Sequence, residues 1–295
     1  MGAVPVFVSV TEELVIDLDD LVSKADAADI LMLSHMRGHM CDMDALMDIC
    51  DAHNIRVIED CAHTMGAKWR ETFSGRHGVM GCYSTQTYKH INSGEGGLLV
   101  SDDEVLMARA TILSGSYMLY ERHLAAPAAE VFEGEEYDTP NVSGRMDHLR
   151  AAILRPQLRD LNTQCQRWNE RYQVIEAGLE GTPGLMIARR SSDETYVGSS
   201  IQFLLLDWEE DRIQSVISRC QRRGVELKWF GGAEPVAFTS RYDSWRYAPS
   251  SQMPKADRIL KGIVDMRIPL TFSLDDCALI ARIIRAEVGA VYQGA

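Results

Sequence analysis

The chain has 295 residues, 46% of them hydrophobic, which is enough to bury a substantial core and corresponds to about two domains. Its formal net charge of −13 argues against nucleic acid and anionic membranes as partners, because both attract basic surfaces. Seven cysteines without paired spacing, and no secretory pattern, predict free thiols and a cytoplasmic location. The acidic charge makes small-molecule chemistry the expected class of function. No apolar run is long enough to span a bilayer, so a soluble protein is expected.

Strands and helices are expected to alternate at the start of the chain. Hydrophobic spacing predicts strands at residues 4–10, 30–33 and 55–58, the second of them buried, and helices at 14–25 and 43–52. This alternation is typical of βαβ units around a parallel sheet, whose ligands bind beyond the carboxyl ends of the strands.

The next part of the chain contains a predicted hairpin and two further strands. The hairpin spans residues 66–75, the strands are expected at 81–85 and 98–101, and a helix follows at 102–113. Lys89 falls in the turn between these two strands.

A long loop and a long helix then connect two predicted domains. Residues 115–144 have no regular pattern, whereas 146–179 have helical spacing, with a kink expected at Pro156. We therefore predict a large domain at residues 1–160 and a small C-terminal α/β domain at 161–295.

The C-terminal part is predicted to form that small domain. Strands are expected at 200–206 and 264–268, and helices at 209–223 and 274–288. An aromatic loop is expected at 229–247, between the first strand and helix and the second strand and helix.

Lys89 is the first candidate for chemistry, because Ser84 precedes it and a glycine-rich turn, Gly94–Gly97, follows it. Glycines let the backbone pack closely against a bound group, and desolvation lowers the pKa of a lysine so that it can form a Schiff base. The plainer alternative is a solvated surface charge.

Asp60, His63 and Ser84 are the candidates that accompany Lys89. Asp60 ends a predicted strand, where its carboxylate can hold a ring nitrogen protonated, although it can also cap a helix. His63 can stack on a planar ring or be structural, and the Ser84 hydroxyl can bind a phosphate or simply end a strand. Together the four residues suit pyridoxal phosphate, which needs a lysine and an acidic partner.

A metal site is the competing hypothesis for the cluster His35, His39, Cys41 and Asp42. Its spacing does not supply a closed tetrahedral set of ligands, so we expect a loop there and no metal.

Several motifs together resemble the DegT/StrS family of pyridoxal-phosphate sugar aminotransferases, which has the aspartate aminotransferase fold. The resemblance implies fold type I, with a mostly parallel sheet in a truncated large domain and a small C-terminal α/β domain. The motifs that carry it are Pro5–Val8, His35–Gly38, Asp42–Asp44, Glu59–His63, Ser84–Gly97, Arg145–Met146 and Ile268–Leu270.

The resemblance also implies a role for each candidate. Lys89 looks like the Schiff-base lysine and proton shuttle, Asp60 like the partner of the pyridinium nitrogen, and His63 like the residue against the ring. Ser84 matches the phosphate-binding serine. Ser143 stands where the family has an asparagine that reaches the phosphate of the partner subunit, which implies a homodimer.

The implied reaction moves an amino group from an amino-acid donor to a keto-sugar or a similar small carbonyl acceptor. Relatives with histidine in place of the lysine are dehydratases, so Lys89 favours amino transfer. Residues 115–141 and 229–247 are candidate walls of the substrate pocket.

Two alternatives stay open. The family has a further segment before the strand at Val4, including part of the phosphate site, so the chain is expected to be a fragment or a shortened homologue. It can therefore be a catalytically inactive interaction or regulatory subunit. A lyase or desulfurase on the same fold is the other alternative.

Overall fold

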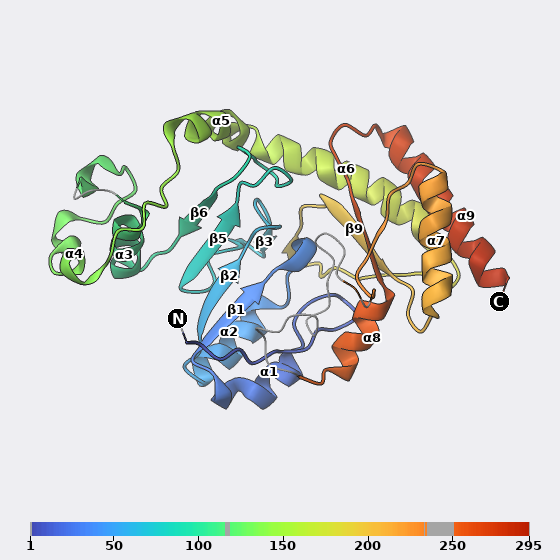
Figure 1. Cartoon of the computed structure of the whole chain (residues 1–295), viewed down its shortest axis with the longest axis horizontal. Helices are drawn as coiled ribbons and strands as arrows, with labels where there is room; N and C mark the ends of the chain where they lie inside the picture. The colour runs from blue at the N-terminus through green and yellow to red at the C-terminus, as the bar shows by residue number, and fades with distance from the viewer. Residues whose placement is uncertain (1, 116–118, 233, 235–250, 295) are drawn as a thin grey trace.

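A four-stranded sheet lies at the centre of the molecule (Figure 1). The computed structural model describes residues 2–115, 119–232, 234 and 251–294. The strand order is β1 (Ile30–Ser34), β2 (Arg56–Asp60), β5 (Met80–Ser84) and β6 (Gly97–Val100). The first three strands are parallel and β6 is antiparallel, which confirms the expected mostly parallel sheet. The carboxyl ends of three strands therefore meet at one edge.

Helices α1 (Leu18–Lys24) and α2 (Met43–Ala52) share a hydrophobic core with one face of this sheet. Asp42 caps α2 because its carboxylate accepts a hydrogen bond from the Ala45 N–H at 3.0 Å. The predicted bounds of α2 are confirmed.

The prediction that β1 is a buried strand holds for only one of its faces. Leu33 points into the core, whereas Ile30 and Met32 are 56% and 63% exposed. Alternate side chains of a strand point to opposite faces, so one face of β1 lacks a covering layer within the described part of the chain.

The strand predicted at residues 4–10 is wrong. Only Val10 makes a β-bridge, to Ile16, and the backbone before it binds side chains of α1 instead of a neighbouring strand. Lys24 Nζ donates to the Phe7 carbonyl at 2.8 Å, and the Ser9 N–H donates to Asp20 at 2.6 Å. Side chains of α1 thus bind two of the backbone groups that a neighbouring strand would bind, and the Ser9 carbonyl accepts from the Asp17 N–H at 2.9 Å.

The start of α1 is also corrected, from residue 14 to Leu18. Leu14 has a left-handed φ of 63°, which a helix does not allow, and Asp17 caps the helix by accepting from the Asp19 N–H. The 3₁₀ turn η1 (Ala25–Ala27) ends the helix, and η2 (Met36–Gly38) follows β1.

The predicted hairpin is confirmed as β3 (Lys68–Trp69) and β4 (Thr72–Phe73). β8 (Glu194–Thr195) pairs with the other edge of β3, so this small sheet joins segments that are far apart in sequence.

The segment after β6 has more structure than the predicted loop. Helix α3 (Glu104–Ser114) is followed by η3 (Tyr120–Arg122), η4 (Ala129–Phe132) and α4 (Glu135–Asp138). Phe132 packs with Ala108 and Ile112 of α3 and stacks on Tyr120 with ring centroids 4.2 Å apart. A small hydrophobic core therefore orders this segment. Its residues are spaced too irregularly for the sequence to predict it. The proposed pocket wall at 115–141 lies partly outside the described residues.

The predicted long helix is divided into α5 (His148–Arg159) and α6 (Leu161–Leu179). Pro156 lies inside α5, and the chain leaves helical geometry at Asp160, where ψ is 0°. Proline removes one backbone hydrogen bond without ending this helix, so the break falls four residues later than predicted.

A second sheet forms the C-terminal part, with the order β10 (Lys228–Trp229), β11 (Ile263–Arg267), β9 (Ser200–Leu204) and β7 (Met186–Ile187). It is antiparallel, and its core includes side chains of α6, α7 (Glu210–Arg222) and α9 (Leu274–Gln293), which lie beside it in Figure 1. The predicted strands and helices here are confirmed, whereas α8 (Pro254–Gly262) was not predicted.

The division at residue 160 stays a prediction. Trp168 and Val197 pack into the core of the first sheet, although they follow that residue in sequence. The aromatic stretch at 229–247 lies largely outside the described residues.

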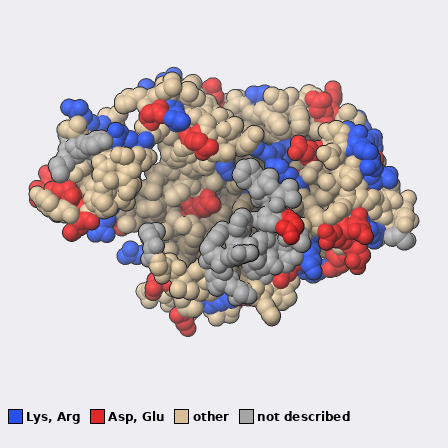
Figure 2. Space-filling view, viewed as in Figure 1, with Lys and Arg blue, Asp and Glu red and all other residues tan. Residues whose placement is uncertain are grey.

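The surface is mixed in charge despite the net charge of −13. Figure 2 shows acidic and basic side chains interspersed over the visible face. No helix within the described ranges is long and apolar enough to cross a membrane.

A buried carboxylate, Glu59 on β2, fixes the loops around the sheet edge. It is 0% exposed and accepts hydrogen bonds from the backbone N–H groups of Gly75, His77 and Gly78 at 2.7–2.9 Å. His35 Nε2 donates a fourth bond at 3.0 Å. Burial raises the pKa of Glu59, but these hydrogen bonds outweigh it, so the pKa is lower than usual and the group is ionised.

Glu59→Gln should lower the free energy of unfolding by roughly 2–4 kcal/mol, because its amide NH₂ would face groups that donate. Denaturant unfolding at pH 7 measures this. Glu71→Gln, at an exposed position, is the control and should be nearly neutral. An equal effect of the two substitutions would contradict the importance of the Glu59 network.

The same variant should change the dependence of stability on pH. A carboxylate with a depressed folded pKa stabilises the fold above its unfolded pKa of about 4.3 and loses that contribution as pH falls through the folded value. The stability gap between wild type and Glu59→Gln should therefore narrow on acidification. A gap that stays constant between pH 7 and acid would refute this.

Candidate functional site

The candidate site lies at the carboxyl edge of the first sheet, where β1, β2 and β5 end. Ser34 pairs with Asp60 in the register of β1 and β2, and Asp60 pairs with Cys82 on β5. Ser84 ends β5, and Lys89 follows five residues later in the turn before β6. The topology thus brings residues of three strands and a loop to one place.

The Asp60 carboxylate is held by two local hydrogen bonds. Oδ2 accepts from the Ser34 hydroxyl and Oδ1 accepts from the Ala62 N–H, both at 3.0 Å. No helix begins after Asp60, since residues 61–66 form turns. The helix-cap alternative is therefore wrong, and the carboxylate is oriented at the edge of the sheet.

Lys89 is paired with His63. Its Nζ lies 3.1 Å from His63 Nε2, and its own N–H donates to the Gln86 carbonyl at 3.0 Å. Gly96 adopts a φ of +134°, and a Cβ there would come within 2.8 Å of Thr85 Oγ1. The glycine-rich turn is thus needed for the close backbone path that carries Lys89.

The surroundings make Lys89 a better nucleophile than an ordinary lysine. Burial and then the positive charge of Arg37 lower its pKa, with a smaller contribution from Arg267, while Asp60 opposes the shift. Burial and the charge of Lys89 also lower the pKa of His63 to about 3. His63 is therefore neutral at physiological pH, and one ring nitrogen can accept a proton from Lys89.

Ser84 belongs to the edge, whereas Ser143 does not. The Ser84 hydroxyl oxygen accepts from the Gln86 N–H at 3.2 Å, which leaves its hydrogen free to donate to an anion. Ser143 lies beside Gly115, with a φ of 52°, and its N–H donates to Asn141 Oδ1 at 2.8 Å. In the described part of the chain no hydrogen bond links Ser143 to the other candidates.

Two arginines near Lys89 were missed from the sequence. Arg267 on β11 donates to the carbonyl of Tyr88, and its guanidinium lies 4.3 Å from the centre of the Tyr88 ring. Arg37 Nη2 lies 3.3 Å from Asp265 Oδ2, also on β11. The second sheet carries Arg267 and Asp265, and no local pattern in the sequence places it against Lys89.

The residues considered for a metal are engaged elsewhere. His39 Nε2 bonds to Gln202 at 2.8 Å and Asp42 caps α2. His35, Glu59 and Cys61 do bring ligand atoms within 4.8 Å of one another. However, the Glu59 oxygens already accept four hydrogen bonds, and burial raises the pKa of Cys61 to about 12, so its thiol stays protonated. A protonated thiol and a carboxylate whose oxygens are already hydrogen-bonded are poor metal ligands.

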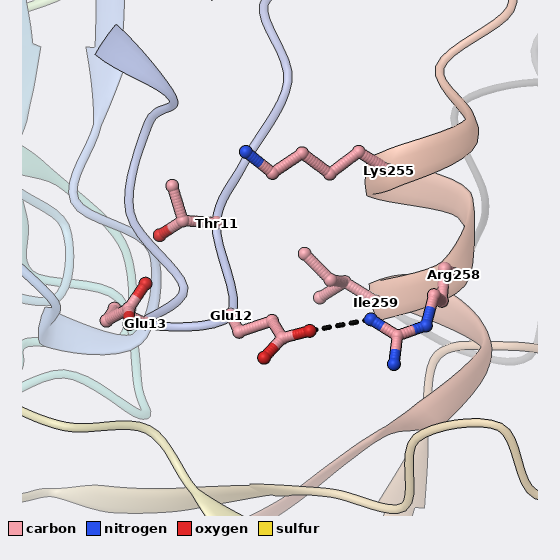
Figure 3. Close-up of a pocket in the computed structure, with 6 residues that line it drawn as sticks. All are labelled: Thr11, Glu12, Glu13, Lys255, Arg258 and Ile259. Carbon is pink, nitrogen blue, oxygen red and sulfur yellow. Dashed lines mark hydrogen bonds and ion pairs between the residues drawn. The ribbon is translucent and has the colours of Figure 1, made fainter. Parts of the chain in front are cut away.

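A pocket of about 320 Å³ lies elsewhere, between the turn after Val10 and α8. Figure 3 shows Glu12 reaching across it to Arg258, with N–O distance 2.6 Å. Arg258 also pairs with Asp207, and none of the predicted site residues lines this pocket. Both cations that line the pocket, Lys255 and Arg258, therefore already have carboxylate partners.

Comparison with known proteins identifies the family. The DegT/DnrJ/EryC1/StrS aminotransferase family matches residues 1–285. The chain belongs to this family.

Individual relatives are aminotransferases. The chain is 34% identical over 173 residues to L-glutamine:scyllo-inosose aminotransferase of Streptomyces griseus, covering 57% of this chain and 40% of the relative. It is 26% identical over 245 residues to dTDP-3-amino-3,4,6-trideoxy-alpha-D-glucose transaminase of Streptomyces venezuelae, covering 81% and 58%. The chain thus spans about half the length of these curated relatives.

Solved structures show the same fold. The aminotransferase TlmJ from Streptoalloteichus hindustanus superposes with a TM-score of 0.82 at 20% identity, covering 99% of this chain and 75% of that one. A synthase of 3-amino-5-hydroxybenzoic acid gives a TM-score of 0.78 at 23% identity, covering 98% and 75%. The expected fold type I is therefore confirmed.

The charges around Lys89 predict how its reactivity responds to substitution. Asp60→Asn should move the pH midpoint of Lys89 modification to lower pH, because it removes the charge that raises the pKa of Lys89. Trinitrobenzenesulfonate labelling across pH, read by mass spectrometry of the Lys89 peptide, measures the midpoint.

Asp102→Asn, at an exposed residue paired with Arg76, is the matched control and should leave that midpoint unchanged. A pH midpoint that rises in Asp60→Asn, or that does not change, would show that Asp60 does not raise the pKa of Lys89.

Proposed function

We propose that this chain is a pyridoxal-phosphate-dependent aminotransferase, which moves an amino group from an amino-acid donor to a keto-sugar or a similar small carbonyl. Membership of the aminotransferase family supports the reaction class. The observation that carries the proposal is Lys89 Nζ at 3.1 Å from a neutral His63, at the sheet edge that also bears Asp60.

The residues at this edge fit the cofactor. Asp60 would hold the pyridinium nitrogen, because its carboxylate is already oriented by Ser34 and Ala62. Ser84 has a hydroxyl hydrogen to donate to the phosphate, and Lys89 would carry the covalent link. Pyridoxal phosphate, when bound, supplies an electron sink for the donor's α-carbon.

Lys89 and His63 have different roles in the proposed reaction. Burial and the charge of Arg37 lower the pKa of Lys89, which favours its reaction as a free amine. Once the donor displaces it, its Nζ can take up and return a proton. His63 keeps Nζ oriented through the 3.1 Å contact, and being neutral it does not repel the lysine.

We propose a cyclic polyol ketone as the acceptor. The relatives named for L-glutamine and an inosose are 32% and 34% identical to this chain, against 28% and 26% for two named for nucleotide-linked sugars. L-glutamine is the corresponding donor. The lyase alternative has no such support.

A homodimer in the cytoplasm is part of the proposal. Exposed Ile30 and Met32 leave apolar surface on β1 of the kind that associates. Ser143 lies on a segment away from Lys89, where it would serve the partner's site. All seven cysteines are free, which suits a reducing compartment.

Lys89→Ala should abolish covalent attachment of pyridoxal phosphate, because no other lysine among the described residues is paired with His63 at the edge that bears Asp60. Borohydride reduction followed by mass spectrometry should place the cofactor on the Lys89 peptide of the wild type. Lys255→Ala is the control, since Lys255 is paired with Asp17 at 2.5 Å and lies away from the edge. Attachment that survives in Lys89→Ala would overturn the assignment.

Transfer of ¹⁵N from labelled L-glutamine to scyllo-inosose tests the reaction itself. Asp60→Asn should slow it by about 100-fold or more, because the ring nitrogen would lose its ionic partner. A folded wild type that binds the cofactor without transferring nitrogen would favour a lyase. One that does not bind the cofactor would favour the regulatory-subunit alternative.

A further inference from the structure

His90, the residue after Lys89, is a buried side chain to which the proposed reaction gives no role. It is 8% exposed, and its Nε2 lies 3.1 Å from the hydroxyl oxygen of Ser199, just before β9. Its Nδ1 is buried and has no hydrogen-bond partner in the described part of the chain. Orphaned N–H donors are rarer in proteins than orphaned acceptors, so we assign the hydrogen to Nε2, which donates to Ser199.

The ring of His90 also belongs to a closed cycle of contacts. It packs edge-on against Trp168 of α6, with ring centroids 5.1 Å apart and an interplanar angle of 83°. Trp168 Nε1 donates to the Ile268 carbonyl at 3.1 Å, and the Ile268 N–H donates to the Ser199 carbonyl at 2.9 Å. The position of the His90 ring is therefore fixed by α6, by the start of β9 and by the end of β11, which are far apart in sequence.

The second sheet thus holds both neighbours of Lys89. Arg267 donates to the carbonyl of Tyr88 on one side, and Ser199 accepts from His90 on the other. A lysine side chain is long and flexible, so the place that its Nζ reaches depends on where its backbone is held. Interactions that fix the two neighbours therefore fix the origin of the Lys89 side chain.

His90 acts on Lys89 without a charge of its own. Burial, with the charges of Lys89 and Arg267, lowers the pKa of His90 to about 4, so its ring is neutral at physiological pH. Burial also lowers the pKa of Lys89. The charges that act on that amine are those of Arg37 and Arg267, which lower its pKa further, and of Asp60, which raises it. His90 contributes a hydrogen bond and the packing of its ring.

We propose that His90 is a positioning residue for Lys89, because its hydrogen bond to Ser199 holds the peptide that carries Lys89 against the second sheet. The inference rests on the proposed function, which it deepens by naming what keeps the reactive amine beside His63. The packing of the second sheet then determines where Nζ lies at the edge of the first.

Substitution by phenylalanine separates the hydrogen bond from the packing, because it keeps a ring against Trp168 and has no N–H to donate. In the cofactor-free protein, His90→Phe should raise the pH midpoint of Lys89 labelling by trinitrobenzenesulfonate by about half a pH unit. A lysine that is held less firmly is less buried, and the loss of one ordinary hydrogen bond can cause a shift of this size. Ser199→Ala should raise the midpoint as much, and the double variant no further.

His90→Gln is the rescue variant, since its amide N–H can donate to Ser199 although it has no ring. It should keep the wild-type midpoint. His53→Phe is the matched control and should also leave the midpoint unchanged. His53 Nδ1 likewise bonds to a side-chain oxygen, of Asp26 at 2.9 Å, but His53 precedes β2 and lies at the opposite end of that strand from Asp60.

An unchanged midpoint in folded His90→Phe would overturn the proposal. A midpoint that rises in His90→Gln and not in His90→Phe would also overturn it, because packing of the ring alone would then position Lys89. Additive shifts in the double variant would contradict it as well, since the two side chains would act separately. Circular dichroism melting shows whether each variant is folded, and Ser199→Ala tests the same bond if His90→Phe unfolds.

The labelling assay needs neither cofactor nor turnover, so its outcome does not depend on the proposed function. The expected shifts, together with no nitrogen transfer by the wild type, would refute the proposed function alone. Nitrogen transfer by the wild type without those shifts would refute the role of His90 alone.

In the enzyme loaded with pyridoxal phosphate, His90→Phe should lower kcat for nitrogen transfer about tenfold and leave the KM for L-glutamine unchanged. Lys89 would be misplaced for moving the proton, whereas the contacts that bind the donor would remain. A raised KM with an unchanged kcat would contradict the assignment, because His90 would then act on substrate binding.

Discussion

The buried carboxylate of Glu59 is the constraint on which the site depends. A charge with 0% exposure is stable only when it is fully hydrogen-bonded, and Glu59 obtains its donors from His35 and from the backbone at residues 75–78. The first donor fixes the loop after β1, and the others fix the approach to β5. Asp60, the next residue, is thereby held between two anchored loops.

The same anchoring fixes the segments that form the candidate site, which follow one another along the chain. The loop that binds Glu59 leads directly into β5, which ends at Ser84, and the glycine-rich turn then carries Lys89 back toward His63. Parallel pairing of β1, β2 and β5 brings these side chains to one edge. Stability of the core and geometry of the candidate site are therefore properties of one network.

The second sheet contributes electrostatics to this edge. Arg267 binds the peptide before Lys89, and Asp265 on the same strand pairs with Arg37. A further buried bond, from Trp168 Nε1 to the Ile268 carbonyl at 3.1 Å, ties α6 to the end of β11. The reactivity of Lys89 thus depends on how the two cores pack, because charges from both act on its pKa.

Errors in the predicted fold have a common physical origin. Residues 4–10 have the composition of a strand, yet Asp20 and Lys24 bind the Ser9 N–H and the Phe7 carbonyl in place of a neighbouring strand. The segment 115–144 lacks periodicity, yet Phe132 gives it a small core. In both cases contacts beyond the local window outweigh local preference.

The sequence by itself determined α2, the strands of the first sheet, the C-terminal α/β elements and the motif that contains Lys89. The spacing of hydrophobic residues, a helix-capping aspartate and a glycine-rich turn are sufficient to predict these elements, because each signal acts within a few residues. Only the tertiary structure decided that Arg37 and Arg267 lie at Lys89 and that Ser143 lies apart. Long-range packing places these groups, since 179 residues separate Tyr88 from Arg267 and no local pattern encodes their contact.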